Sequence, residues 1–134
     1  MTTVAEGTFT VQMKPLAEPG MSDGVSLGRL SLDKTFTGDL AAIGEGQMLT
    51  AMTPVQGSAG YVAIERVTGT LHGRAGSFVL QHAGTMHAGT QQLSITVVPA
   101  SGTGELAGIE GVFKLRIEGG QHHYMLEYSL PTSN

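Results

Sequence analysis

The sequence contains no cysteine, which excludes disulfide bonds and thiolate metal ligands. It is also poor in charge: charged residues make up 13% of the chain, Lys and Arg together number 7, and the formal net charge is −4. A nucleic-acid-binding protein neutralises phosphates with a surface rich in Lys and Arg. Nucleic acid is therefore not an expected partner.

Long apolar runs are absent as well. No stretch approaches the roughly 18 consecutive apolar residues of a transmembrane helix. The opening residues, MTTVAEGTF, lack the basic and apolar regions of a signal peptide. We therefore expect a cytoplasmic protein with no membrane partner. Its 134 residues suit a single domain over residues 1–134, with one sizeable core.

Glycine, by contrast, is abundant, with 20 of 134 residues, where about 7% is usual. Polar and apolar residues alternate in most segments, and no segment of ten or more residues fits helical spacing better. This pattern predicts an all-β fold of about eight strands joined mostly by hairpins. We expect a closed antiparallel barrel, because closure removes sheet edges and glycine permits bending. A two-sheet sandwich is the alternative.

The segment 61–84, YVAIERVTGTLHGRAGSFVLQHAG, is the centre of this expected fold. It predicts a hairpin that turns at Gly73-Arg74, because glycine accepts the positive φ of a tight turn. In that register Glu65 lies directly opposite His82 on the apolar face of the hairpin. The result is one carboxylate facing one imidazole.

Two further turns define the faces of the later strands. A turn at Ala88-Gly89 places His82 opposite Ile95, so two turns independently assign His82 to the apolar side. A turn at Gly119-Gly120 pairs His122 with Ile117 on the core side of the last hairpin, the face that also carries Tyr124.

The facing of the strand 40–52 depends on the turn before it. A two-residue turn at Gly38-Asp39 pairs Leu32 with Glu45, so that Glu45 and Gln47 point inward. The strand's own pattern is ambiguous, because Met48 and Met52 occupy the other face. Lys34 on the preceding strand is expected to form a structural ion pair with Glu45, with a ligand carboxylate or solvent as alternative partners.

Other segments predict a first strand over residues 8–13 and irregular connections elsewhere. The Pro- and Gly-containing stretch 14–24 is expected to be a loop that folds over a barrel mouth. Residues 99–111 predict a compact loop, and residues 131–134 a short tail.

Three stretches resemble a known family: ERVTGTLHGRAGSFVLQHAG (65–84), DKTFTGDL (33–40) and VVPASGTGELAGIEG (97–111). They are similar to an uncharacterised bacterial family of about this length, whose structures adopt the small antiparallel barrel of allene oxide cyclases. The GTGELAGIEG run is also similar to a loop of allene oxide cyclases and dirigent proteins. The resemblance implies an apolar barrel that binds a small apolar or amphipathic molecule and steers a cyclisation or isomerisation. It assigns no catalytic residue.

The residues themselves give Glu65 and His82 as candidate catalytic residues, with Glu65 as proton acceptor and His82 as the group that orients it. The alternative is a buried polar pair that only fastens the strands. Seven further residues are expected to line a ligand cavity. They are Tyr61, Gln47, Glu45, Tyr124, His122, Leu80 and Ile95.

The sequence is compatible with three functions. The first is a cofactor-independent enzyme of the isomerase or lyase type, and the second is a noncatalytic carrier or sensor of an apolar ligand. The third is a homo-oligomeric scaffold that assembles through an outward face with Arg66, Gln81, Thr68 and Val79. No metal is expected, because the five His are scattered and neither HExxH nor a cupin-type motif is present.

Overall fold

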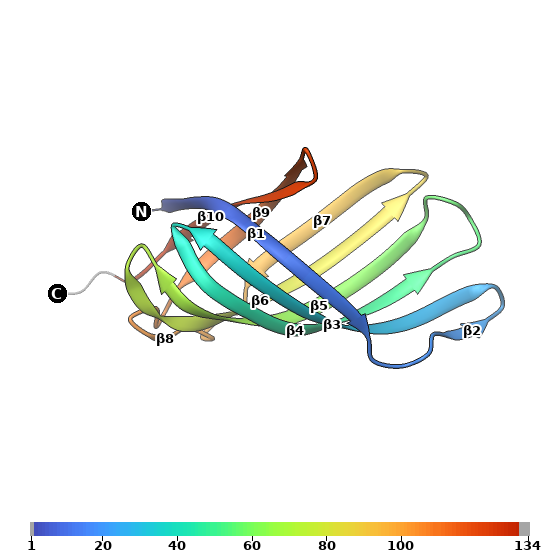
Figure 1. Cartoon of the computed structure of the whole chain (residues 1–134), viewed down its shortest axis with the longest axis horizontal. Helices are drawn as coiled ribbons and strands as arrows, with labels where there is room; N and C mark the ends of the chain where they lie inside the picture. The colour runs from blue at the N-terminus through green and yellow to red at the C-terminus, as the bar shows by residue number, and fades with distance from the viewer. Residues whose placement is uncertain (1, 132–134) are drawn as a thin grey trace.

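The computed structural model describes residues 2–131, which form ten β-strands (Figure 1). The strands are β1 (Thr3–Pro15), β2 (Gly20–Ser22), β3 (Val25–Gly38), β4 (Leu40–Met52), β5 (Ala59–Leu71), β6 (Arg74–His87), β7 (Thr90–Val97), β8 (Thr103–Gly104), β9 (Glu110–Glu118) and β10 (Gln121–Ser129). None of the described residues belongs to a helix that could span a membrane.

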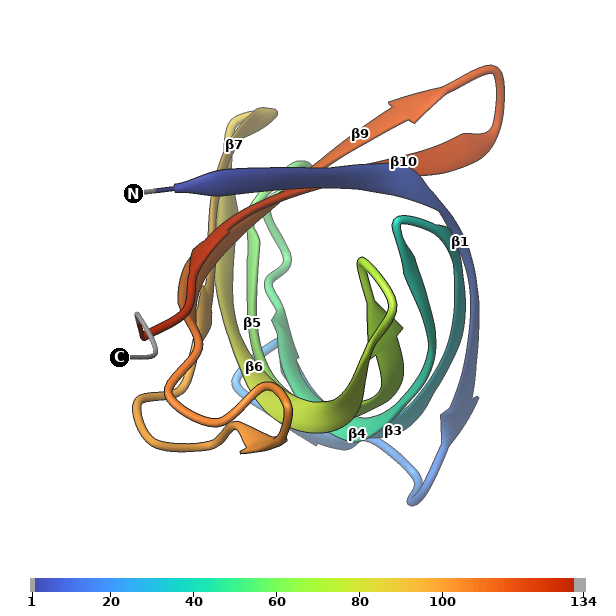
Figure 2. The ribbon, with the colours of Figure 1, turned by 90° about the vertical axis from the view of Figure 1, so that its left-hand side faces the viewer.

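Eight of these strands close into an antiparallel barrel, which confirms the expected fold. Their order is β1-β10-β9-β7-β6-β5-β4-β3, and pairing of β1 with β3 completes the ring. Figure 2 shows this ring from the end at which β8 lies. The short strands β2 and β8 add to the edges of β3 and β6.

The β7–β9 pairing is the weakest seam of the barrel. A single residue pair, Thr96 with Val112, represents it, whereas β6 and β7 pair over eight positions from Leu80 to His87. Beyond this pair the tip of the β9–β10 hairpin stands away from β7 (Figure 2). Among the described residues, backbone pairing therefore joins β7 to β9 at this one position.

The core fills the end of the barrel at which β8 lies. Phe36, Phe113 and Tyr124 contact one another there, with ring centroids 5.7–6.1 Å apart. Leu106 and Ile109, from the connection between β7 and β9, are fully buried in the same cluster. The compact loop expected over residues 99–111 thus contributes side chains to the core. We call this the closed end.

Two of the predicted turns are confirmed together with their registers. At Ala88-Gly89, His82 pairs with Ile95. At Gly119-Gly120, His122 pairs with Ile117. Positive φ angles occur at all four turn residues, as tight hairpins require.

The predicted turn of the β5–β6 hairpin is wrong by one residue. His72 and Gly73 form it, with φ angles of 49° and 79°, and Leu71 pairs with Arg74. Glu65 is therefore opposite Leu80, and His82 is opposite Ala63. Shifting a turn by one residue shifts the pairing by two, so every side chain keeps its predicted face. The left-handed conformation of His72 is held from outside the hairpin, because its backbone N–H donates to the Asp39 carbonyl at 2.8 Å.

The predicted facing of β4 is also wrong. Lys34 pairs with Gly44, a shift of one residue that reverses the faces, so Glu45 and Gln47 are exposed on the outside of the barrel. The connection at Gly38-Asp39 does not close as a two-residue hairpin, because its N–H groups bond elsewhere. The N–H of Asp39 donates to the Glu6 carbonyl, and that of Leu40 donates to the Tyr124 hydroxyl.

The segments that flank the first strands differ from the prediction in extent. β1 runs from Thr3 to Pro15, longer than the expected 8–13. The segment 14–24 includes β2, and it is exposed and projects beyond the barrel (Figure 1). It lines no part of the cavity described below, so the prediction that it covers a mouth is wrong. Of the expected tail, residues 132–134 lie outside the described residues.

Candidate functional site

A cavity of about 360 Å³ occupies the barrel interior opposite the closed end. Most of its walls are apolar, with Phe9, Leu93 and Leu115 among them. Four methionines from three strands also line it: Met13, Met48, Met52 and Met86. The polar groups that reach it include Lys34, His82, Tyr61 and His122.

Three buried polar side chains meet at the floor of this cavity. Lys34 on β3 donates from Nζ to Oε1 of Glu65 on β5 at 2.9 Å. Nε2 of His82 on β6 lies 2.7 Å from the same oxygen. The side chains of Lys34, Glu65 and His82 are 6%, 0% and 3% exposed. We call these three residues the floor triad.

The triad places its members at different depths. Lys34 and His82 line the cavity, whereas Glu65 is fully buried and does not. Oε2 of Glu65 is buried without a hydrogen-bond partner among the described residues. A Cβ atom at Gly44 would lie only 2.9 Å from that oxygen, so the glycine leaves the carboxylate its space.

Glu65 remains ionised in this buried position. Burial, the largest single influence, raises the pKa of the Glu65 carboxyl. The hydrogen bond from His82, together with the positive charge and hydrogen bond of Lys34, outweighs burial and lowers the pKa below its ordinary value. A carboxylate only accepts hydrogen bonds, so Nε2 of His82 carries the proton that points to Glu65. In the neutral form of His82 the other ring nitrogen, Nδ1, then carries no proton and can accept a hydrogen bond.

Two aromatic residues complete the polar part of the cavity. The ring of Tyr61 lies 6.5 Å from that of His82, and both burial and the negative charge of Glu65 raise the pKa of the Tyr61 hydroxyl. The ring of His122, on β10, lies 5.0 Å from Phe9. Lys34 Nζ also lies over the Phe9 ring, at 5.1 Å from its centroid.

The structure brings together only part of the predicted site. His82, Tyr61 and His122 line the cavity, and Glu65 is fully buried and hydrogen-bonded to His82. Leu80 and Ile95 are buried in the core and do not line it, and Tyr124 lies at the closed end. Glu45 and Gln47 point away from it, for the reason given above.

Sequence reasoning missed the true partner of Lys34 and the methionine lining. The expected ion pair exists, but with Glu65 and not with Glu45. The sequence did show that Met48 and Met52 share one face of their strand. The expected turn at Gly38-Asp39 assigned that face to the outside, which hid the signal.

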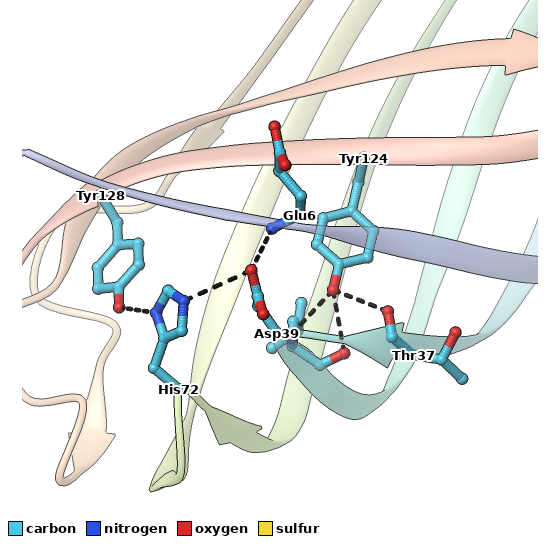
Figure 3. Close-up of polar contacts among 7 residues, drawn as sticks. Glu6, Thr37, Asp39, His72, Tyr124 and Tyr128 are labelled. Carbon is cyan, nitrogen blue, oxygen red and sulfur yellow. Dashed lines mark hydrogen bonds and ion pairs between the residues drawn. The ribbon is translucent and has the colours of Figure 1, made fainter.

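A second polar cluster fastens the closed end (Figure 3). The Tyr128 hydroxyl hydrogen-bonds to Nδ1 of His72, and Nε2 of His72 lies 3.5 Å from the carboxylate of Asp39. That carboxylate in turn accepts the N–H of Glu6 at 2.9 Å. We call Asp39, His72 and Tyr128 the clasp, because they join the β5–β6 turn to β10 and to the β3–β4 connection.

Tyr124 lies beside the clasp and serves the backbone (Figure 3). Its hydroxyl accepts the N–H of Leu40 at 2.8 Å and donates to the Thr37 carbonyl at 2.9 Å. The predicted ligand-binding residue Tyr124 therefore satisfies backbone groups of the β3–β4 connection. No group of three potential ligands that could hold a metal ion occurs within residues 2–131.

Comparison with known proteins gives the family. The family described as "Protein of unknown function (DUF3224)" matches residues 5–128. The chain belongs to the DUF3224 family. This confirms the resemblance to an uncharacterised family, and the closed barrel fits it.

A solved structure of the DUF3224 family is similar over nearly the whole chain. It is the crystal structure of a protein of unknown function from Shewanella oneidensis MR-1, and it shares 49% sequence identity with this chain. The match covers 99% of this chain and 100% of that one, with a TM-score of 0.94. No curated protein matches this DUF3224 chain.

Proposed function

We propose that this protein binds a small, largely apolar molecule in the barrel cavity, with one polar group of the ligand against the floor triad. The observation that supports this most is the cavity itself. Its volume of about 360 Å³ lies within the range of roughly 300–1,000 Å³ typical of small-molecule sites. Its apolar walls surround a few convergent polar groups, as such sites usually do.

Within this proposal, His82 contacts the ligand and Glu65 orients His82. This reverses the roles expected from the sequence, because Glu65 lies beneath the floor whereas His82 lines the cavity. Nδ1 of His82 can accept a proton from a ligand, and the Glu65 carboxylate then stabilises the imidazolium. The adjacent Lys34 ammonium stabilises negative charge that develops on a ligand oxygen. This is cofactor-independent proton transfer of the isomerase type.

A noncatalytic carrier or sensor is the second candidate function. The exposure of Met13, Met52 and Met86 at the mouth favours it. Methionine is unbranched and flexible, so a rim of methionines adapts to ligands of different shape and lets them exchange. Both functions require that an apolar molecule enters the cavity.

Binding is tested with the neutral fluorophore 1-aminoanthracene, whose emission rises in an apolar site. We expect the wild-type protein to bind it, and Met48→Arg to bind at least tenfold more weakly because a guanidinium enters the apolar wall. Met52→Arg, at the rim, provides the same test if Met48→Arg does not fold. Met21→Arg, in the exposed strand β2, is the matched control and retains wild-type affinity. A wild-type protein that binds no dye, or equal losses in the cavity and control variants, would refute the proposal.

Proton transfer separates the enzyme from the carrier. In D₂O, 2-tetralone exchanges its acidic α-hydrogens, which is followed by NMR. If His82 acts as a base, wild-type protein accelerates this exchange at least tenfold over an equal concentration of His82→Gln. His87→Gln, on the same strand but exposed and outside the cavity lining, retains the acceleration. Equal exchange with wild-type protein and His82→Gln would leave only the carrier.

A further inference from the structure

We infer that the ligand of the cavity is an organic monoanion with an apolar body, and that it binds together with one proton, which His82 holds. This inference rests on the proposed function, because it concerns the same cavity. It specifies the charge of the ligand and links its binding to pH.

The cavity lining selects against cations. Its charged and titratable groups are Lys34, His82, His122 and Tyr61, and no Asp or Glu of the described residues belongs to it. Glu65, the nearest carboxylate, gives Oε1 to both of its partners, and its Oε2 lies toward Gly44. An ammonium group in the cavity therefore finds no free carboxylate, whereas an anion finds Lys34 and His82.

The charge balance of the floor requires a proton with the anion. Lys34 and Glu65 already neutralise each other at 2.9 Å, and both are almost completely buried. A ligand anion alone would set two negative charges against one positive charge, and buried unpaired charge is strongly unfavourable. Protonation of His82 at Nδ1 restores the balance of two positive and two negative charges.

The proton has a defined place in the resulting complex. It comes from solution or from the ligand's own acid form, and it forms an N–H bond at Nδ1 of His82. That N–H donates to the ligand anion, while the proton on Nε2 stays on the bond to Glu65. As this N–H bond forms, the bond that held the proton in its donor, the dissolved acid or the ligand's carboxylic acid, breaks, and no other covalent bond changes.

Other groups near His82 do not change this count of charges. From β5 it faces Glu65 and Tyr61, from β3 Lys34, and from β10 His122 across the cavity. Its neighbour on β7 is Ile95, which does not titrate. Of these, only His122 is a second imidazole, so His122→Gln shows whether that ring takes the proton instead.

The test compares three probes that share an eight-carbon alkyl chain: octanoate, octanol and octylamine. Each is titrated into the protein by calorimetry between pH 6 and 8, in phosphate and in Tris. We expect octanoate to bind at least tenfold more tightly than octanol, and octylamine to bind more weakly than either. The two buffers differ in ionisation enthalpy, so they report proton uptake. We expect uptake to approach one proton per octanoate, with affinity falling toward tenfold per pH unit as pH rises. Binding of octanol is expected to take up no proton.

Variants assign the proton to His82. His82→Gln abolishes the uptake and His122→Gln retains it, while Lys34→Met removes the preference for octanoate over octanol. The inference is overturned if octanol or octylamine binds as tightly as octanoate, if octanoate binds without proton uptake, or if uptake is lost in His122→Gln. Should His82→Gln not fold, His122→Gln and the wild-type proton count decide the result. If the inference is overturned but 1-aminoanthracene still binds, the proposed function stands. If neither the dye nor any of the three probes binds, both the proposed function and this inference are overturned.

Discussion

At the scale of single residues, the floor triad shows how a barrel interior holds charge. Lys34, Glu65 and His82 come from three different strands and share one oxygen atom, Oε1 of Glu65. Both partners bond to Glu65, so removing Glu65 leaves both without it, whereas removing Lys34 or His82 leaves Glu65 with one partner. For a buried pair, loss of one partner typically costs about 3–5 kcal/mol. Glu65 is therefore the member on which the other two depend.

The triad predicts acid sensitivity of the fold. The pKa of Glu65 in the folded protein lies below its ordinary value of 4.5. A carboxyl group with a lowered folded pKa contributes stability that is present above the unfolded pKa and lost as pH falls through the folded pKa. We therefore expect Glu65→Gln to lower the free energy of unfolding by about 3 kcal/mol at pH 7. The difference from wild type shrinks below about pH 4.5.

Urea denaturation at pH 7, 5, 4 and 3 measures this difference. Glu45→Gln is the matched control, because Glu45 is on the next strand but exposed on the outside of the barrel. An exposed substitution of this kind usually changes stability by no more than about 0.5 kcal/mol. A Glu65→Gln effect that is the same at every pH would contradict the account.

At the scale of elements, the β5–β6 turn depends on the clasp. His72 adopts a left-handed conformation that is uncommon for residues other than glycine. Its ring and its N–H are held by Tyr128 and by Asp39, which belong to other strands and connections. The turn is thus positioned by contacts from elsewhere in the sequence.

Removing the clasp hydroxyl is expected to destabilise the protein modestly. Tyr128→Phe deletes the hydrogen bond to His72, and such a bond typically contributes about 1 kcal/mol. Tyr61→Phe is the control, because the described residues offer no hydrogen bond to its hydroxyl, and we expect a change within about 0.5 kcal/mol. Urea denaturation at pH 7 measures both. Equal stability of Tyr128→Phe and wild type would show that the clasp contributes nothing.

The turns also explain which parts of the fold could be predicted from the sequence. Gly119-Gly120 and Ala88-Gly89 form tight hairpins from their own residues, and their registers were predicted correctly. The β5–β6 turn shifted because Asp39 and Tyr128 fix His72, and the Gly38-Asp39 connection differs because Glu6 and Tyr124 take its N–H groups. Where residues distant in sequence fix a turn, the local sequence does not predict the strand register.

The candidate site was predicted correctly where the strand register error preserved the faces of the strands, and incorrectly where it did not. The assignment of Glu65 and His82 to one face survived a register error, because the error shifted the pairing by two residues. The assignment of Glu45 and Gln47 did not survive, because the β3–β4 error was a single residue. The ion pair between Lys34 and Glu65 joins side chains of two strands that are not neighbours in the sheet. Alternation along a strand predicts which face a side chain is on, but not which side chain it reaches on that face.

At the scale of the whole molecule, the two ends of the barrel differ in construction. The closed end is filled by aromatic side chains and by Leu106 and Ile109, and the clasp fastens its connections. The opposite end holds the cavity and the exposed methionines. The packed core and the cavity proposed to bind a ligand thus lie at opposite ends. Substitutions at the mouth are accordingly the ones most easily tolerated by the fold.

The pairing of β1 also sets the order in which the barrel is made. β1 lies between β3, a near neighbour in the chain, and β10, whose Tyr128 pairs with Thr3. On the ribosome, the first strand can find one neighbour early but waits for almost the whole chain to emerge before it meets the other. Contacts this distant in sequence slow folding, and until then both sheet edges stay open to other chains. Synthesis of the last strand is therefore the step that ends the period of aggregation risk.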